Sequence, residues 1–167
     1  MRNIIKQLIS FILPFTVLVL VPLYIENDYS IPHILILISG LSIMASGFYL
    51  MIMTITKFIR IGKGTLAPWS PTKKLVTGGI YGHVRNPMII GVLIVLIGES
   101  IAVLSLNILI WAVIFFIINN LYFFIYEEPS LEKRFGEEYR EYKKNVPRWL
   151  PGKKSYKPDR KLNTEIS

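Results

Sequence analysis

An apolar run from Met88 to Tyr126 constrains the fold more than any other feature of the sequence. It contains a single charged residue, Glu99, and it is far longer than the roughly 20 residues that one helix needs to cross a hydrocarbon core. The run therefore predicts two membrane-spanning helices, with the polar residues around Ser105 at the turn between them. We expect these two spans to form a tight helical hairpin over residues 88–105 and 108–126.

Two earlier apolar runs predict further spans, over residues 8–25 and 31–56. Pro14 and Pro22 interrupt the first run, which a membrane helix tolerates better than a soluble one. The whole chain is 52% hydrophobic and 18% charged, whereas soluble domains carry about 25% charged residues. These features predict an all-α integral membrane protein with about four transmembrane helices and no Rossmann domain.

Basic residues alternate with the spans in a way that predicts the topology. Arg2 and Lys6 precede the first span, the loop before the second carries only acids, and basic residues return in the segment before the third span and after Tyr126. This pattern predicts a multi-pass protein whose two termini are cytoplasmic. The net charge of +8 then indicates contact with anionic membrane lipids rather than with nucleic acid. We expect one membrane domain over residues 1–151 and a basic, disordered tail over 152–167.

The sequence argues against a metal or redox centre. It has no cysteine, which excludes disulfides, thiolate metal sites and a cysteine nucleophile. Its two histidines, His33 and His83, fall on opposite sides of the membrane in the predicted topology. A shared histidine metal site is therefore not expected.

The segment from Leu75 to Met88 gathers residues that suit ligand binding. Its three glycines allow sharp turns and close approach of the backbone to a ligand, although their spacing is not that of a dinucleotide fold. Pro87 suits the first turn of the third span, which leaves Arg85 and Asn86 at a helix N-terminus that favours anionic groups. A basic loop that only touches lipid phosphate is the alternative interpretation.

Adjacent acids, Glu127 and Glu128, follow the last span directly. Carboxylates are unfavourable both in lipid and at the negative end of a helix, so we expect a compensating cation. That cation could be Arg85, a lysine or a positively charged ligand, and an exposed pair at the helix exit is the alternative.

Beyond these acids, an apolar stripe recurs at helical spacing from Leu131 to Val146. It predicts one amphipathic helix that lies on the membrane surface or covers a site there, with Trp149 as an interfacial anchor. Within the spans, Glu99 is expected to reach outward or bond to Ser100, and a functional role for this intramembrane carboxylate is the alternative. Asn119 and Asn120 are expected to make hydrogen bonds between helices.

The order and spacing of these motifs resemble the isoprenylcysteine carboxyl methyltransferase family of integral membrane enzymes, and more loosely the phosphatidylethanolamine N-methyltransferases. The resemblance covers roughly residues 60–151. It is carried by Gly79–Tyr81, Arg85–Pro87, Gly91, Glu127–Leu131, Phe135–Tyr139, Tyr142 and Val146–Pro147.

The resemblance implies an S-adenosylmethionine-dependent methyltransferase that acts on a lipidic or small hydrophobic acceptor. Carried over residue by residue, it implies a cofactor pocket formed by Lys73, Lys74, Leu75, Val76, Tyr81, Asn86, Pro87, Met88, Ile89 and Glu127. Charge and position add His83 to the cofactor site and make Arg85 and Glu128 the candidate catalytic residues. S-adenosylmethionine carries a sulfonium, an ammonium and a carboxylate, so its site needs both acids and a cation.

The sequence departs from the eukaryotic pattern of this family at three positions. Asn86 stands where a histidine is usual, Ile89 stands where a tyrosine often follows, and Phe123 replaces an arginine that some members use as a substrate contact. These changes put the substrate site in more doubt than the cofactor site. A membrane sterol or lipid reductase that uses NADPH, and a small scaffold without enzyme activity, remain the alternatives.

Overall fold

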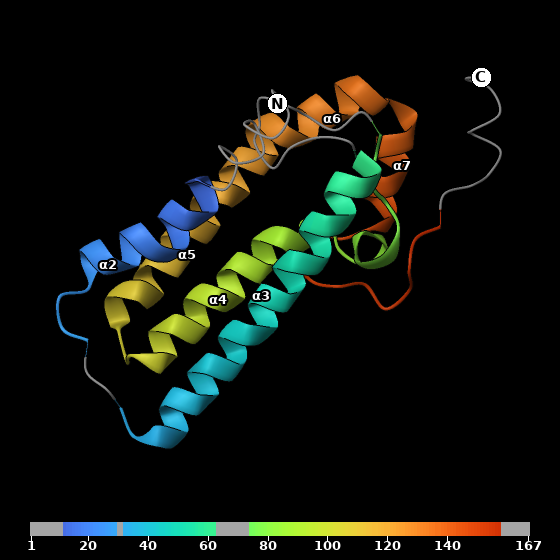
Figure 1. The fold of residues 1–167 in the computed structure, drawn as a ribbon. Coiled ribbons are helices and arrows are strands. Elements are labelled where there is room, and N and C mark those ends of the chain that lie inside the picture. Colours follow the sequence, from blue (N-terminus) through green and yellow to red (C-terminus); the bar gives the residue numbers. More distant parts are fainter. Residues whose placement is uncertain (1–11, 30–31, 63–73, 158–167) are drawn as a thin grey trace, which may run out of the picture.

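The computed structural model describes residues 12–29, 32–62 and 74–157, which form helices and loops without a strand in those ranges (Figure 1). The elements in chain order are η1 (Thr16–Leu20), α2 (Val21–Ile25), α3 (Ile34–Gly62), η2 (Gly79–Gly82), α4 (Pro87–Ala102), α5 (Leu106–Tyr122), η3 (Phe123–Glu127), α6 (Glu128–Phe135) and α7 (Glu137–Asn145). The all-helical prediction is confirmed for this part of the chain.

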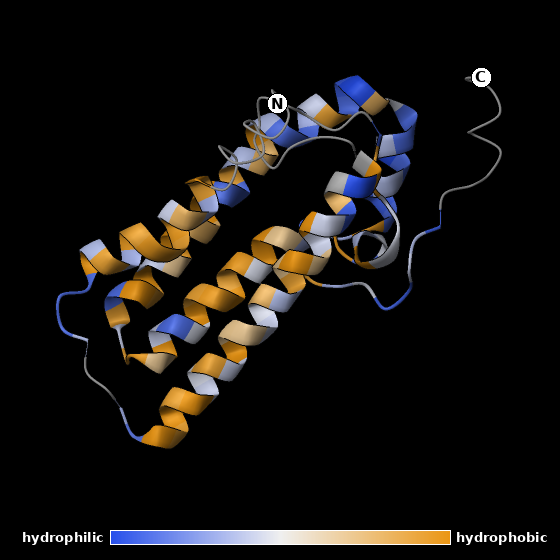
Figure 2. Cartoon of the chain, viewed as in Figure 1, coloured by the Kyte–Doolittle hydropathy of each residue, from blue (hydrophilic) through white to orange (hydrophobic). Residues whose placement is uncertain are grey.

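Two helices are long and apolar enough to cross a membrane, namely Ile34–Phe58 and Leu106–Phe135. The apolar helices Ile12–Ile25 and Pro87–Ala102 are shorter and pack beside them. We call Ile12–Ile25 the N-terminal helix. Hydrophobic residues predominate along all four, whereas hydrophilic residues gather on α6 and α7 at one end of the bundle (Figure 2). We call this end the polar end.

Glycines bring α3 and α4 into close contact along most of the length of α4. A Cβ atom at Gly47 would lie 2.8 Å from the Gly91 carbonyl oxygen, and one at Gly98 would lie 2.6 Å from the Met44 backbone nitrogen. Small residues allow this approach, which favours van der Waals packing between helices in lipid. The buried core beside this contact includes Leu96, which joins α4 to the side chains of α5.

The predicted hairpin between α4 and α5 is present. Ser105 precedes α5, and its hydroxyl accepts a hydrogen bond from the Ile108 backbone N–H at 3.1 Å, as expected of a helix N-cap. The same hydroxyl donates to the carboxylate of Glu26, which follows α2. The loop after α2 is thereby tied to the hairpin turn at the end of the bundle opposite the polar end.

Each of two π-helical turns ends two residues before a proline. η1 precedes Pro22, and η3 precedes Pro129. Proline lacks an N–H and its ring clashes with the preceding turn of an α-helix, so a wider turn relieves the conflict. The last helix consequently continues through Glu127 and Glu128 as far as Phe135, whereas the sequence predicted an end at Tyr126.

The predicted amphipathic helix over residues 131–146 is interrupted. Gly136 adopts a φ of +54°, a value that favours glycine, and it separates α6 from α7. The apolar stripe nevertheless faces one way, because Tyr139, Tyr142 and Val146 form a buried cluster against which Leu131 and Phe135 pack. The stripe therefore packs within the protein at the polar end.

Candidate functional site

The loop before α4 turns sharply at η2 and buries Tyr81 under α7. Gly79 has a φ of +65°, which a residue with a side chain rarely adopts. The hydroxyl of Tyr142 on α7 donates a hydrogen bond of 2.7 Å to the Tyr81 carbonyl oxygen. Burial raises the pKa of both tyrosines above the usual value.

The segment after α7 runs back along this loop and closes over it. Backbone hydrogen bonds join Arg85 N–H to the Pro147 carbonyl at 3.0 Å, Gly152 N–H to the His83 carbonyl at 2.8 Å, and Tyr156 N–H to the Gly82 carbonyl at 2.9 Å. Residues 152–157 were expected to belong to a disordered tail, yet they hold this loop. Residues 158–167 lie outside the described part of the chain.

Glu128 is the centre of an ion-pair network that ties the polar end together. Its Oε1 lies 2.9 Å from Arg85 Nη1 and 2.7 Å from Arg148 Nε, and its Oε2 lies 3.2 Å from Lys143 Nζ. Its side chain is only 4% exposed, and the three cations offset the cost of removing this carboxylate from water. The predicted compensation by Arg85 or a lysine is thus confirmed, and Arg148 is an additional partner.

Arg148 and Trp149 also fix the polar end to α5. Arg148 Nη1 donates to Asn120 Oδ1 at 3.1 Å, and Trp149 Nε1 donates to the same oxygen at 2.9 Å. Trp149 packs against Phe116 and Phe123, with ring centroids 5.1 and 6.0 Å away. Asn120 therefore joins α5 to the C-terminal segment, whereas the amide of Asn119 donates to the Phe115 carbonyl within its own helix.

A cavity of about 730 Å³ lies beneath this network. Its polar side includes Arg85, Glu127 and Glu128, and its inner walls come from the apolar faces of the N-terminal helix, α3, α4 and α5. Both oxygens of Glu128 already contact cations, but Glu127 receives only the Tyr122 hydroxyl, at 3.3 Å, among the described residues. The buried Nε of Arg85 has no hydrogen-bond partner in that part of the chain. The cavity thus offers an acid and a guanidinium donor on adjoining surfaces.

Most of the predicted site residues line this cavity. Those brought together are Leu75, Val76, Tyr81, Arg85, Asn86, Pro87, Met88, Ile89, Glu127 and Glu128. Lys74 is exposed and is not among the lining residues, and Lys73 lies outside the described residues. His83 does not line the cavity either, because its Nδ1 lies 2.8 Å from the Gly152 carbonyl oxygen and holds the C-terminal segment.

The fold adds to the cavity several residues that the sequence analysis did not assign to the cofactor site. Asn119, Tyr122, Ser130, Arg134 and Tyr139 come from the helix that carries the acids or from α7. Leu13, Pro14, Val17, Met51, Ile55 and Phe58 come from the N-terminal helix and α3. Helical spacing of four or five residues from Glu127 could have identified Tyr122, but no local signal points to the wall formed by the first two helices.

Replacing Tyr142 by phenylalanine tests how far α7 stabilises the loop at Tyr81. The change leaves the buried Tyr81 carbonyl without its hydroxyl donor, which should destabilise the protein by about 1–3 kcal/mol. Thermal melting of detergent-purified protein measures the loss. Tyr24, which is 86% exposed, provides the matched control, and Tyr24→Phe should melt like the wild type. Equal melting temperatures for Tyr142→Phe and wild type would contradict the assigned contact.

Comparison with known proteins finds a family match over a segment that includes Arg85, Glu127 and Glu128. The family described as phospholipid methyltransferase matches residues 35–138. The chain is 32% identical over 83 residues to the protein-S-isoprenylcysteine O-methyltransferase of Schizosaccharomyces pombe, a match that covers 46% of this chain and 33% of that enzyme. It is also 46% identical over 46 residues to an uncharacterized protein of Haemophilus influenzae, covering 26% of this chain and 73% of the other.

These comparisons differ in how much they cover. The chain spans about a third of the length of the S. pombe enzyme, so the likeness is partial. No solved structure matches the chain significantly. The family match, by contrast, extends over more than half of the chain, from the start of α3 through the acids to the beginning of α7. The chain therefore belongs to the phospholipid methyltransferase family of membrane methyltransferases.

Proposed function

We propose that this protein transfers a methyl group from S-adenosylmethionine to a lipidic or small hydrophobic acceptor at the membrane surface. The observation that carries the proposal is the single cavity that joins Glu127 and Arg85 to deep apolar walls. Membership of a methyltransferase family implies S-adenosylmethionine as the methyl donor. The S. pombe relative is named as a protein-S-isoprenylcysteine O-methyltransferase, which makes an isoprenylcysteine-like acceptor one candidate substrate.

The residues at the polar side suit the charged groups of S-adenosylmethionine. Glu127 has one hydroxyl partner among the described residues and would hold the ammonium group. Arg85 lines the cavity and would bind the carboxylate, because its Nε has no partner among the described residues, while its Nη1 is held by Glu128. Tyr81 and the wall formed by Pro87, Met88 and Ile89 would pack against the apolar parts.

We assign different roles to the two acids and to Arg85. Glu128 positions Arg85 and the C-terminal segment, because its oxygens are occupied by cations. Glu127 and Arg85 bind and orient the cofactor. The cofactor itself supplies the activated methyl group, so the protein contributes alignment and a cavity that excludes water. The apolar walls between the helices would admit an acceptor from the bilayer.

We also propose that four helices cross the membrane, with the polar end on the cytoplasmic side. The excess of lysine and arginine at the segments flanking the polar end supports this orientation. α4 has 16 residues and is about 24 Å long, somewhat short for a 30 Å core, but it pairs with α5 through a tight turn. The cofactor would then enter from the cytosol and the acceptor from the lipid.

Calorimetry on the detergent-solubilised protein tests the cofactor site. S-adenosylmethionine should bind to the wild type, and Glu127→Gln should weaken binding about tenfold or more, because it removes a charge-assisted hydrogen bond without changing side-chain size. The matched control is Glu137→Gln, since that side chain is 71% exposed and pairs only with Arg140 among the described residues. Equal affinities for Glu127→Gln and wild type would refute the site. Binding of NADPH in place of S-adenosylmethionine would refute the reaction and favour a reductase.

A further inference from the structure

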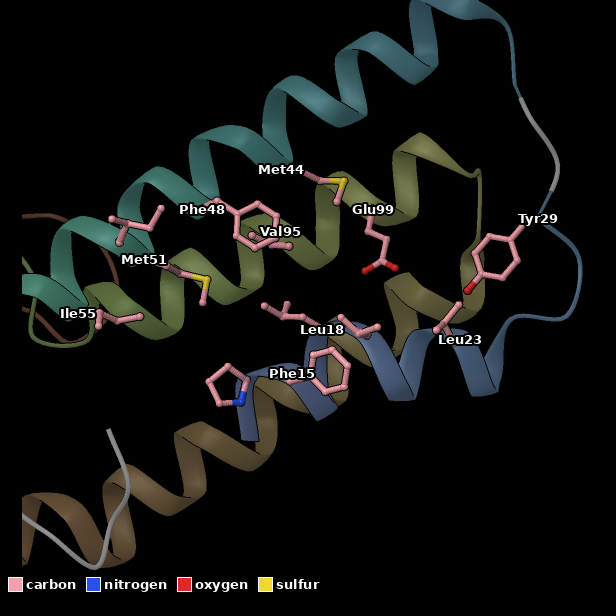
Figure 3. A pocket seen from close by; sticks show the side chains of 13 residues that line it. Phe15, Leu18, Leu23, Tyr29, Met44, Phe48, Met51, Ile55, Val95 and Glu99 are labelled. Carbon is pink, nitrogen blue, oxygen red and sulfur yellow. The ribbon is translucent and has the colours of Figure 1, made fainter. Parts of the chain in front are cut away.

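A second cavity, of about 610 Å³, lies between the N-terminal helix, α3 and α4 (Figure 3). Pro14, Met51 and Ile55 line both this cavity and the first one, so the two adjoin. The second cavity extends from there toward the end of the bundle opposite the polar end. We call it the lateral cavity.

The walls of the lateral cavity are almost entirely apolar. Phe15, Leu18, Phe48 and Val95 face one another across it (Figure 3). Leu23 and Ile52 at its margin are 58% and 65% exposed, so the cavity opens sideways to the surroundings of the bundle. In a membrane, that opening faces lipid chains.

Glu99 places a carboxylate at the far end of this apolar space, where it points into the cavity (Figure 3). Its Oε2 is buried and has no hydrogen-bond partner among the described residues. The predicted bond to Ser100 is not formed, because the Ser100 hydroxyl donates to the Ile97 carbonyl at 2.8 Å. A carboxylate oxygen left unbonded in apolar surroundings is unfavourable, so this position suits a ligand that donates a hydrogen bond.

The position of Glu99 along the bundle restricts the kinds of ligand that could bind to it. Glu99 lies in the last turn of α4, near the level of Tyr29 and of the bond between Glu26 and Ser105. With the four helices crossing the membrane as proposed above, lipid head groups would lie near that level, whereas the walls toward Phe48 and Ile55 match a hydrocarbon chain. A single-chain amphiphile has this combination of a donor at one end and an apolar remainder.

We propose that the lateral cavity binds a single-chain amphiphile whose ammonium or hydroxyl group donates a hydrogen bond to Glu99. The apolar chain lies between the N-terminal helix and α3 and points toward Met51 and Ile55, where the two cavities adjoin. This site is separate from the cofactor site and does not rest on the proposed methyl transfer.

Photolabelling of the full-length protein in lipid nanodiscs tests the proposal. The probes are a long-chain amine and a long-chain alcohol that carry a diazirine in the chain, with the methyl-terminated hydrocarbon of equal length as control. Mass spectrometry should locate the amine and alcohol on residues of the lateral cavity. Glu99→Leu should lower labelling by both about tenfold, because a hydrogen bond to a carboxylate is lost, and should leave labelling by the hydrocarbon unchanged.

Two further variants distinguish the ligand chemistry and guard against misfolding. Glu99→Gln should lose labelling by the amine and keep that by the alcohol if the carboxylate charge recognises an ammonium. Leu23→Trp should fill the outer part of the cavity and reduce labelling by both probes. Glu99→Leu should melt no lower than the wild type, since it removes an unbonded buried oxygen. If both probes label no better than the hydrocarbon, or equally in Glu99→Leu, the proposal is wrong.

Discussion

Glu128→Gln is expected to lower the melting temperature of the purified protein by on the order of 10 °C and to abolish the proposed methyltransferase activity. The substitution keeps the shape of the side chain but leaves Arg85, Arg148 and Lys143 close together without their shared anion. Removing one partner of a buried ion pair costs about 3–5 kcal/mol, and each kcal/mol corresponds to about 2–4 °C for a chain of this size. Thermal melting in detergent measures the effect.

Glu132 provides a matched control for this prediction. It also pairs with Lys143, at 2.8 Å, but its side chain is 33% exposed and Lys143 is 39% exposed. Exposed ion pairs contribute about 0–1 kcal/mol, so Glu132→Gln should shift the melting temperature by no more than a few degrees. The double variant Glu128→Gln with Arg148→Gln should lose less than the sum of the single losses, because the two residues contact each other. Similar melting temperatures for Glu128→Gln and Glu132→Gln would contradict the central role of Glu128.

The loss of activity in Glu128→Gln would act through Arg85. Glu128 holds Nη1 of Arg85, while the Nε of the same guanidinium is buried and has no hydrogen-bond partner among the described residues. Without Glu128, Arg85 has no fixed orientation for a carboxylate. The same network joins the loop before α4, the start of α6, α7 and the C-terminal segment, so cofactor affinity and stability should fall together.

The sequence could predict the helices and the convergence of the two motifs. Long apolar runs identified α3 and α5, the polar turn identified Ser105, and the uncompensated acids indicated a cation such as Arg85. These features are local, or they follow from the cost of a charge near lipid. Most of the residues that the family pattern predicted for the cofactor site do line the cavity, although they form only part of its wall.

The sequence could not predict features that depend on tertiary contacts. The end of an apolar run does not mark the end of a helix, and the π-helical turn η3 lets the chain pass Pro129 without a break. His83 has the polarity of a ligand-binding residue, yet it bonds to Gly152, far along the chain. The lateral cavity beside Glu99 arises from how the N-terminal helix packs, which no local pattern encodes.

Gly47→Leu is expected to have the other large effect, because it forces α3 and α4 apart. Even a Cβ at Gly47 would lie 2.8 Å from the Gly91 carbonyl oxygen and from the Val95 backbone nitrogen, and backbone atoms cannot yield as a flexible side chain can. Overpacking of this kind costs about 1–3 kcal/mol when side chains can move and more when backbone must shift. We expect a fall in melting temperature of roughly 10 °C or more, or loss of a monodisperse protein in size-exclusion chromatography.

Ser46→Leu isolates this effect from the added hydrophobic bulk. Ser46 is the neighbour of Gly47 on the same helix, its side chain is exposed, and its hydroxyl bonds only to the Ile43 carbonyl of its own helix among the described residues. The control should therefore melt like the wild type. Because α3 and α4 supply walls of both cavities, separating them should also weaken S-adenosylmethionine binding, although Gly47 lines neither cavity. If Gly47→Leu melts and binds as Ser46→Leu does, the close contact between α3 and α4 is not what shapes the cavities.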